Sequence, residues 1–256
     1  MAIARWAFLS VLLVGGCASS DTVSLLASDG QQAVTRDGAP SLISAKRNIV
    51  MFQTSGEEVQ SGQRPSFVIA LQNLQPNMVN FSPAGITASA VDEFGQTKPL
   101  KVFSYAELVA EEKRRQTGAA IGAALLGASR AYNASNAGYS NTYGTFNARN
   151  NYGATASGTY SASTYNSYQA YSAQQLASAQ TSADFANIRR EGAERLAAMK
   201  GSIIREQTMR SGEWYGGTIV LEVPKKERNG SVGYEIDIEF DGEHYSFNVK
   251  QSKSDS

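Results

Sequence analysis

Carboxylates and one histidine near the C-terminal end are the residues that could do chemistry in this chain. Asp237, Glu239 and Asp241 alternate along one predicted strand, and His244, the only histidine, follows them. A carboxylate pair could supply general acid and base, and histidine with carboxylates could bind a metal ion. However, alternating carboxylates are typical of a solvated strand face, and one histidine cannot build a multi-histidine site. No phosphate-binding or dinucleotide-binding glycine pattern is present. We therefore expect no catalytic residue, no metal site, no cofactor and no enzymatic activity.

Residues 1–16, together with Cys17, have the organisation of an export signal. Arg5 supplies a positive charge, an apolar run follows, and Val14-Gly15-Gly16-Cys17 places two small residues directly before a cysteine. This segment resembles the lipobox of bacterial lipoproteins. The resemblance implies that the signal peptide is removed, that Cys17 is lipidated, and that Ala18 directs the protein to the outer membrane. A secretory signal with a chance cysteine is the alternative.

Cys17 is the only cysteine in the chain, so no disulfide can form within it. Several acyl chains on one residue give stable attachment, because each buried methylene contributes about 0.8 kcal/mol. No segment reaches the roughly 20 apolar residues that span a bilayer. We therefore expect attachment to the cell outer membrane through the N-terminal lipid, with the body on the periplasmic face or the cell surface. The balance of 23 basic and 23 acidic residues argues against a nucleic-acid partner.

The mature chain begins with polar sequence and then changes to a strand pattern. Residues 17–45 are rich in Ser, Asp, Gly and Gln and indicate a lipidated, flexible tether. Short apolar runs separated by turn residues fill 46–103 and 213–251. Asp241-Gly242 suits a two-residue type I′ hairpin turn, in which both central residues need positive φ. The pattern predicts an α+β chain built on an antiparallel immunoglobulin-like β-sandwich. A small barrel is the alternative.

Residues 104–212 interrupt this strand pattern with helix-patterned sequence. Ser104 and Glu107 have the spacing of a capping box, in which each side chain satisfies a free backbone N–H group. We expect the first helix to begin there and to fray near Tyr132. Two helices that leave and re-enter one β-domain imply an antiparallel helical hairpin.

A return helix is expected on the far side of the insertion. Ser172 suits its N-cap, the helix should run to about Arg210, and Gly212 should stop it. Glu191 and Arg195 are placed to pair on its surface. Apolar or small residues recur along one face, at Phe185, Ile188, Gly192, Leu196, Met199 and Ile203.

Two glycines of the first helix have the spacing that permits close approach of helices. We expect Gly118 and Gly122 to pack against Leu196 and Met199 of the return helix. Contact of the two glycines with another subunit or with lipid is the alternative.

The middle of the insertion is a low-complexity tract. Residues 131–183 hold eight of the twelve tyrosines and a single charged side chain, Arg149. The part rich in Tyr, Asn, Ser and Gly, residues 132–171, has too little apolar mass to form a core, so we expect a mobile tip. Flat aromatic rings suit stacking on peptides, sugars or other tyrosines. The candidate interaction residues are Tyr139, Tyr143, Tyr152, Tyr160 and Tyr165.

Trp214-Tyr215 lies where the insertion rejoins the strand pattern, and either packs there or forms an aromatic ligand-binding pair. Beyond the lipobox, the stretches 47–52, 64–72, 100–116 and 212–224 are similar to an uncharacterised lipoprotein group with an Ala/Tyr/Asn-rich insertion in a β-domain. This resemblance implies the architecture and no activity. We expect a structural, interaction or assembly module with an envelope protein partner or self-association. A glycan- or peptidoglycan-binding lipoprotein that uses Trp214 and the tyrosines is the alternative.

Overall fold

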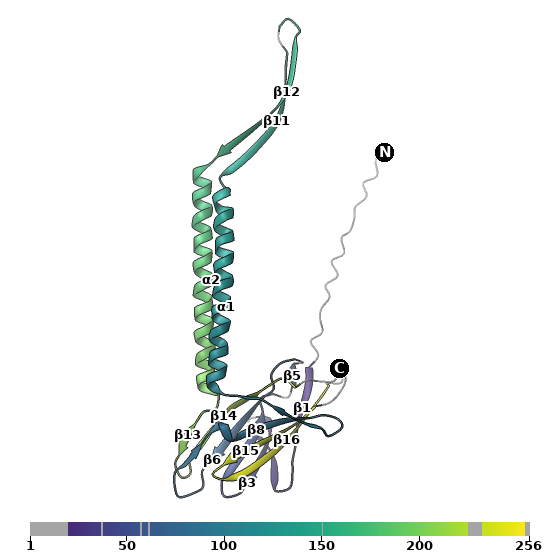
Figure 1. Cartoon of the computed structure of the whole chain (residues 1–256), viewed down its shortest axis with the longest axis vertical. Coiled ribbons are helices and arrows are strands. Elements are labelled where there is room, and N and C mark those ends of the chain that lie inside the picture. Colours follow the sequence, from purple (N-terminus) through teal and green to yellow (C-terminus); the bar gives the residue numbers. More distant parts are fainter. Residues whose placement is uncertain are drawn as a thin grey trace. The chain divides into compact units, whose positions relative to one another are not determined.

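The described residues form an α+β fold with antiparallel sheets and two long helices (Figure 1). The computed structural model describes residues 20–36, 38–56, 58–60, 62–149, 151–224 and 232–253. The predicted signal peptide and Cys17 therefore lie outside the described residues. The chain divides into two compact units, one made of residues 1–104 and 202–256 and the other of residues 105–201.

In the part of the first unit that the structure describes, the strands form two six-stranded antiparallel sheets and one small pair. The first sheet has the order β5 (Glu58–Gln60), β1 (Ser20–Leu26), β16 (Glu243–Lys253), β15 (Val232–Phe240), β8 (Ile86–Val91) and β9 (Thr97–Leu100). The second has the order β10 (Val102–Phe103), β14 (Trp214–Leu221), β6 (Ser66–Gln72), β4 (Ile49–Thr54), β3 (Ala39–Ala45) and β2 (Gln31–Arg36). The short strands β7 (Val79–Phe81) and β13 (Gln207–Met209) pair with each other, and the 3₁₀ turn η1 (Pro83–Gly85) follows β7.

One hydrophobic core lies between the two sheets, as in a β-sandwich. Side chains alternate between core and outer face along β6 and β15, which is the period expected of half-buried strands. The ring of Phe52 stacks on Phe67 of the neighbouring strand with centroids 5.2 Å apart. On its other side it stacks on Phe247 of the opposite sheet, at 5.0 Å. These stacked rings join the two layers.

The predicted turn between the last two strands is confirmed. Asp241 and Gly242 have φ angles of 53° and 72°, and the flanking residues Phe240 and Glu243 face each other in the ladder. Positive φ at both central positions is the type I′ requirement that favours an Asp-Gly pair.

The prediction of a flexible tether over 17–45 is wrong for the described residues from Ser20 onward. β1 pairs with β16 and β5, and β3 pairs with β2 and β4. Each strand buries only a few side chains, such as Val23 and Leu42, so the segment reads as polar. Buried Asp21 also accepts a hydrogen bond from Gln251 Nε2 at 2.7 Å. Backbone pairing and these few buried side chains order the segment without the apolar alternation that is typical of strands.

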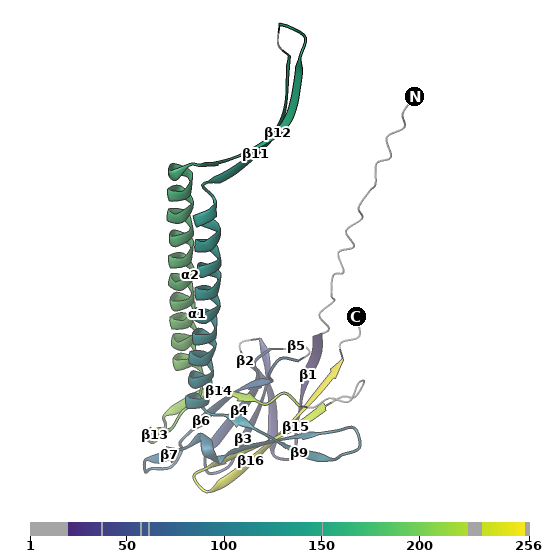
Figure 2. The same cartoon turned by 45° about the horizontal axis from the view of Figure 1, so that its top comes forward.

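The second unit contains the helices α1 (Tyr105–Asn136) and α2 (Ser167–Ser202), which Figures 1 and 2 show side by side. α1 extends one turn beyond the predicted fraying point. α2 begins before the predicted cap Ser172, because Asn166 Oδ1 accepts the Gln169 N–H at 3.1 Å and caps it instead. No helix in the described part of the chain is apolar over enough of its length to cross a membrane.

The predicted C-terminal end of the return helix is also wrong. α2 stops at Ser202, and the Ile204 N–H donates to the Thr218 carbonyl at 3.1 Å. Residues 207–209 then form β13, where Met209 is fully buried in the core of the first unit. Gly212 has φ of 75° and belongs to a tight turn of that unit. Burial of these apolar residues in the sandwich ends the helix earlier than its own sequence would.

The least exposed positions of the two helices follow an eleven-residue repeat. In α1 they are spaced by four, four and three residues, at Leu108, Glu112, Gln116, Ala119, Ala123, Gly127, Arg130 and Ala134. In α2 the same repeat is present, at Ala170, Ala173, Ala177, Thr181, Asp184, Ile188, Gly192, Arg195 and Met199. A repeat of 3.67 residues per turn keeps one stripe on one side of a helix over many turns. We call these two stripes the seam.

Glycines make the closest approaches along the seam, but not the glycines that we predicted. A Cβ atom added at Gly127 would lie 2.7 Å from Thr181 Cγ2, and one at Gly192 would lie 2.4 Å from the Gln116 side chain. At Gly118 and Gly122 an added Cβ would meet no atom within 4 Å. The predicted packing of these two glycines against Leu196 and Met199 is therefore wrong. They lie off the stripe, and their contact with another subunit or lipid stays a prediction.

Two alanine substitutions in α1 should distinguish a glycine with open space beside it from a glycine that packs against α2. Gly122→Ala should raise the free energy of unfolding by about 0.5–1 kcal/mol, because alanine forms helix better than glycine. Gly127→Ala gains the same propensity but overpacks against Thr181, at a cost of about 1–3 kcal/mol. We expect a net loss of stability there in urea unfolding.

Adding Thr181→Ala to Gly127→Ala should restore the lost stability, because it removes the methyl and hydroxyl groups that the new Cβ meets. Equal stabilisation by Gly122→Ala and Gly127→Ala would contradict the close approach at Gly127.

Candidate interaction site

The predicted mobile tip is instead a regular β-hairpin. β11 (Tyr139–Arg149) and β12 (Thr155–Tyr165) pair antiparallel over eleven residues, from Tyr139 opposite Tyr165 to Arg149 opposite Thr155. The register has no bulge. The prediction of a mobile tract is wrong because cross-strand pairs order residues that have too little apolar mass to form a core.

Two cross-strand pairs of glycine with an aromatic residue hold the middle of this hairpin. Gly144 lies opposite Tyr160, and Phe146 lies opposite Gly158. A Cβ added at Gly144 would fall 2.4 Å from the Tyr160 ring, and one at Gly158 would fall 2.8 Å from the Phe146 ring. Each ring therefore covers the glycine across from it, an arrangement that compensates for glycine in strands.

A repeated tripeptide in the sequence could have revealed this hairpin. Gly144-Thr145-Phe146 and Gly158-Thr159-Tyr160 share the pattern glycine, threonine, aromatic. When the two copies run antiparallel, each glycine faces an aromatic ring and the threonines face each other, as they do here. We call this pattern the Gly-Thr-aromatic motif.

The structure gathers all five predicted interaction tyrosines on this hairpin. Tyr139, Tyr143 and Tyr165 share one face of the ladder, Tyr160 lies on the other face, and Tyr152 is in the connecting turn. The rings of Tyr139 and Tyr165 are 4.8 Å apart. All five are exposed, from 50% for Tyr160 to 97% for Tyr152.

Trp214 belongs to the first unit, and Tyr139–Tyr165 belong to the second. Trp214 is the first residue of β14 and is 46% exposed. Its neighbour Tyr215 is a packing residue. The Tyr215 hydroxyl donates to the Arg205 carbonyl at 3.1 Å and accepts the Arg205 N–H at 2.9 Å.

Charged groups join the helices that carry the hairpin. Glu112, with a side chain only 4% exposed, accepts two hydrogen bonds of 2.8 Å from Arg115 and one of 3.0 Å from Gln116. Arg195 of α2 reaches the same carboxylate at 3.4 Å and also pairs with Glu191, as predicted. Further along, Arg130 of α1 pairs with Asp184 of α2.

The role of Glu112 was not predicted from the sequence. The sequence signal for it is a charged residue, Glu112, at the seam position four residues after Leu108. Hydrogen bonds from Arg115 lower the pKa of Glu112 from 4.5 to about 2, with Gln116 and the charges of Arg115 and Arg195 adding to the effect against the opposing cost of burial. The carboxylate is therefore ionised at neutral pH and fixes the position of both arginines.

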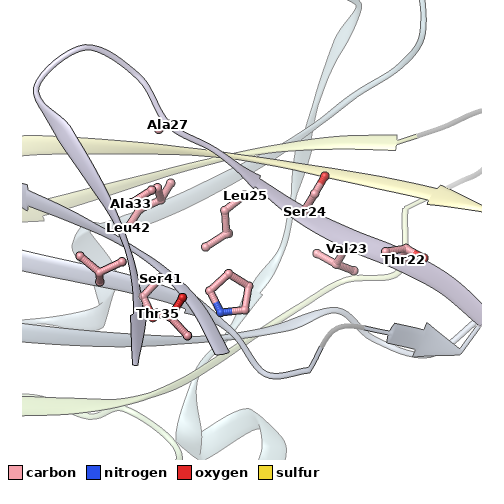
Figure 3. Close-up of a pocket in the computed structure, with 11 residues that line it drawn as sticks. Thr22, Val23, Ser24, Leu25, Ala27, Ala33, Thr35, Ser41 and Leu42 are labelled. Atoms are coloured by element: carbon pink, nitrogen blue, oxygen red, sulfur yellow. The ribbon is translucent and has the colours of Figure 1, made fainter. Parts of the chain in front are cut away.

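A groove of about 460 Å³ beside the first strand is a second candidate site (Figure 3). Residues of β1, β2 and β3 line it, and the lining consists of apolar side chains, among them Val23 and Leu25, with four hydroxyl groups. No charged residue is part of that lining. The groove can hold an apolar group, but it offers no acid, base or nucleophile beyond these hydroxyls.

The carboxylates considered for chemistry have structural surroundings. Asp237 and Glu239 alternate with core residues of β15 and face away from the core. Asp241 accepts a hydrogen bond from Asn48 Nδ2 at 3.2 Å and pairs with Arg47 at 3.6 Å. Within the residues that the structure describes, His, Cys, Asp and Glu form no group of three that could hold a metal ion.

No protein-family model, curated protein or solved structure matches this chain.

The Glu112 network should make the helix pair sensitive to acid. A carboxylate whose pKa is lowered on folding stabilises the fold above its unfolded pKa, and that contribution is lost as the pH falls from about 4.5 towards 2. Glu112→Gln should therefore lower the melting temperature at pH 7 and lose less stability than the wild type between pH 5 and pH 2. Because the Arg115 and Arg195 side chains are partly exposed to water, we expect the free energy of unfolding to differ by on the order of 1 kcal/mol.

Glu194→Gln is the matched control on α2, because Glu194 forms an exposed 4.0 Å pair with Arg190. Its melting curves should follow those of the wild type. Parallel pH profiles for wild type and Glu112→Gln would contradict a role for the buried carboxylate.

Proposed function

We propose that this chain is a lipid-anchored outer-membrane protein that acts as an interaction or assembly module. Lipid on Cys17 would attach it, the β-domain would serve as its base, and α1 and α2 would form a helical hairpin that presents β11 and β12 to a partner in the envelope. The lipobox Val14-Gly15-Gly16-Cys17 supports the anchoring part of this proposal.

The exposure of the paired strands is the observation that carries the interaction role. Every residue of β11 and β12 is exposed except Gly144 and Gly158. The ladder is nevertheless regular, rich in tyrosine and charged only at Arg149. Interface cores are enriched in tyrosine and depleted of charge relative to other protein surface. An ordered surface of this composition suits contact with a protein better than it suits a spacer.

The seam supports the helical-hairpin part of the proposal. Contacts between the two helices join residue numbers that sum to nearly the same value, as in Glu112 with Arg195, Gln116 with Gly192, and Gly127 with Thr181. Such pairing is the mark of two antiparallel helices in contact along their length.

An immunoglobulin-like arrangement is supported by the order of the strands. In such folds one sheet has the order D, E, B, A and the other C′, C, F, G. The segments β10-β14-β6-β4 and β9-β8-β15-β16 have these neighbours in the same chain order. β3 and β2 extend the sheet that contains β4, and β1 and β5 extend the sheet that contains β16. The insertion then lies between the strands equivalent to D and E.

Membrane attachment should depend on Cys17. Cys17→Ser removes the sulfur that would be acylated, so the variant should move from the membrane fraction to the soluble fraction when it is exported through a lipid-independent signal. Fractionation and immunoblotting measure the distribution. A variant that stays with the membranes would contradict lipid anchoring, since acyl chains would no longer hold it.

The exposed tyrosines should carry the partner contact without supporting the fold. Changing Tyr139, Tyr143, Tyr152 and Tyr165 together to Ser should leave the melting temperature within about 2 °C, as expected for exposed side chains. Crosslinks from the hairpin in intact envelopes should be lost, because each stacked aromatic pair adds roughly 0.5–1.5 kcal/mol to a contact. Tyr160 stays, because its ring covers Gly144.

The matched control changes Tyr132, Tyr168 and Tyr171 to Ser, since these are exposed tyrosines of the helices. It should keep the crosslinks. An unchanged crosslinking pattern in the hairpin variant, at equal protein abundance, would contradict the interaction role and indicate that the hairpin is a spacer. If the wild type binds purified peptidoglycan and the hairpin variant does not, the glycan-binding alternative would be favoured.

A further inference from the structure

We propose that β11 of one copy of this chain pairs with β11 of a second copy. The two strands would run antiparallel about a two-fold axis at Thr145, so that two hairpins form one four-stranded sheet. This inference rests on the proposed contact role of the hairpin and names its partner.

The register of the hairpin shows which backbone groups point towards its free edges. The Asn166 N–H donates to the Gly138 carbonyl at 2.8 Å, so this pair is hydrogen-bonded. Antiparallel pairs alternate between hydrogen-bonded and non-hydrogen-bonded. Thr145 and Thr159, which face each other, therefore form a non-hydrogen-bonded pair. Their N–H and C=O groups point outward, Thr145 to the edge of β11 and Thr159 to the edge of β12.

These edges have little of the usual protection against pairing, because Arg149 at the end of β11 is their only charged residue. Natural proteins protect edge strands with lysine, proline, bulges or very short length. Three of the four edge strands of the described sandwich do so: β10 has two residues, β5 has three, and β9 contains Lys98 and Pro99. By contrast, β11 and β12 are eleven residues long, without bulge, lysine or proline.

Pairing with more strands would also stabilise the hairpin. An isolated two-stranded hairpin is marginally stable in water, and three or more strands are the usual requirement. Within the described residues this sheet has only two strands. A second hairpin would raise that number to four and satisfy the outward N–H and C=O groups of β11.

The sequence of the strands favours a second copy over a different protein. The Gly-Thr-aromatic motif of β11 already pairs with the same motif of β12, which shows that the motif is self-complementary when antiparallel. A β11 pair centred on Thr145 places the same residue types opposite each other, glycine opposite aromatic and threonine opposite threonine, but here the threonines form a hydrogen-bonded pair. The near absence of charge gives a differently charged partner nothing to recognise, whereas an identical copy needs no such complementarity.

The side chains favour the β11 edge over the β12 edge. In the proposed pair Tyr143 faces Asn147 of the second copy, and Asn141 faces Arg149, so the two Arg149 charges do not oppose each other. The corresponding outward positions of β12 carry mainly serine and threonine. A pair that includes a tyrosine ring buries more apolar surface than a pair of serine and threonine does.

Two threonines in the same local sequence allow a matched test with the full-length chain in mild detergent. Thr145→Pro removes the N–H that would bond across the two-fold axis, and Thr159→Pro removes the equivalent N–H on the other edge. Neither N–H belongs to the ladder between β11 and β12. Sedimentation velocity should show a dimer for wild type and Thr159→Pro. The dissociation constant of Thr145→Pro should rise at least about tenfold, because the symmetric pair loses two hydrogen bonds and meets two proline rings.

Cysteine substitution gives an independent measurement that does not depend on proline being tolerated. Residues facing each other in a hydrogen-bonded antiparallel pair have Cα atoms about 5.5 Å apart, within the range of a disulfide. Thr145→Cys should therefore form a disulfide-linked dimer on mild oxidation, seen on a non-reducing gel. Thr159→Cys and the wild type, which retains Cys17, should not.

Three results would overturn the proposal. Dimers that dissociate with Thr159→Pro and crosslink through Thr159→Cys would place the contact on β12. Dimers that ignore both prolines would place it elsewhere on the chain. A wild type that is monomeric at tens of micromolar would exclude self-pairing, and if the hairpin tyrosines still gave crosslinks to another envelope protein, the proposed interaction role would stand without it.

Discussion

The insertion leaves and re-enters the sandwich beside a single strand, and this constraint governs the second unit. β10 ends with Phe103 opposite Val220 of β14, and the returning chain places Ile203 beside Thr218 of the same strand. The two connections are therefore fixed two residues apart on β14. A segment held by both ends in this way can be long only if it goes out and comes back. Two helices joined by an antiparallel β-hairpin provide such a path, with backbone groups paired within the helices and between the two strands.

The helices meet this constraint with little apolar mass. Their seam consists largely of alanine and glycine, so backbones approach closely where large side chains would otherwise set the distance. Charged residues supply the remaining specificity: Glu112 with Arg195 near one end and Arg130 with Asp184 further along. Each charged residue has a fixed position along its helix axis. These ion pairs therefore select one register of the two helices among those that a uniform alanine surface would allow.

The hairpin solves a related problem with different residues. Ser, Thr and Asn give strands without a hydrophobic face, and glycine weakens a strand further. The two Gly-Thr-aromatic motifs compensate, since each aromatic ring covers the glycine opposite. The result is a surface that is ordered, aromatic and almost uncharged. In the proposed assembly the same self-complementarity that closes the hairpin within one chain would join two chains.

The sequence by itself determined the features that depend on local chemistry or on a clear period. It predicted the strand-rich domain over 46–103 and 213–251, the turn at Asp241-Gly242, two helices in the insertion, and the pair Glu191–Arg195. It placed the five candidate tyrosines in one tract, although not on strands.

Tertiary structure decided the rest. Residues 20–45 form strands because neighbouring strands supply their hydrogen-bond partners. The sequence of a polar segment does not indicate such long-range pairing. α2 ended at Ser202 because burial of Met209 outweighed helical propensity. Gly127 and Gly192, and not Gly118 and Gly122, became the close contacts, because the rotation of a helix about its axis is set by all the residues of its seam at once.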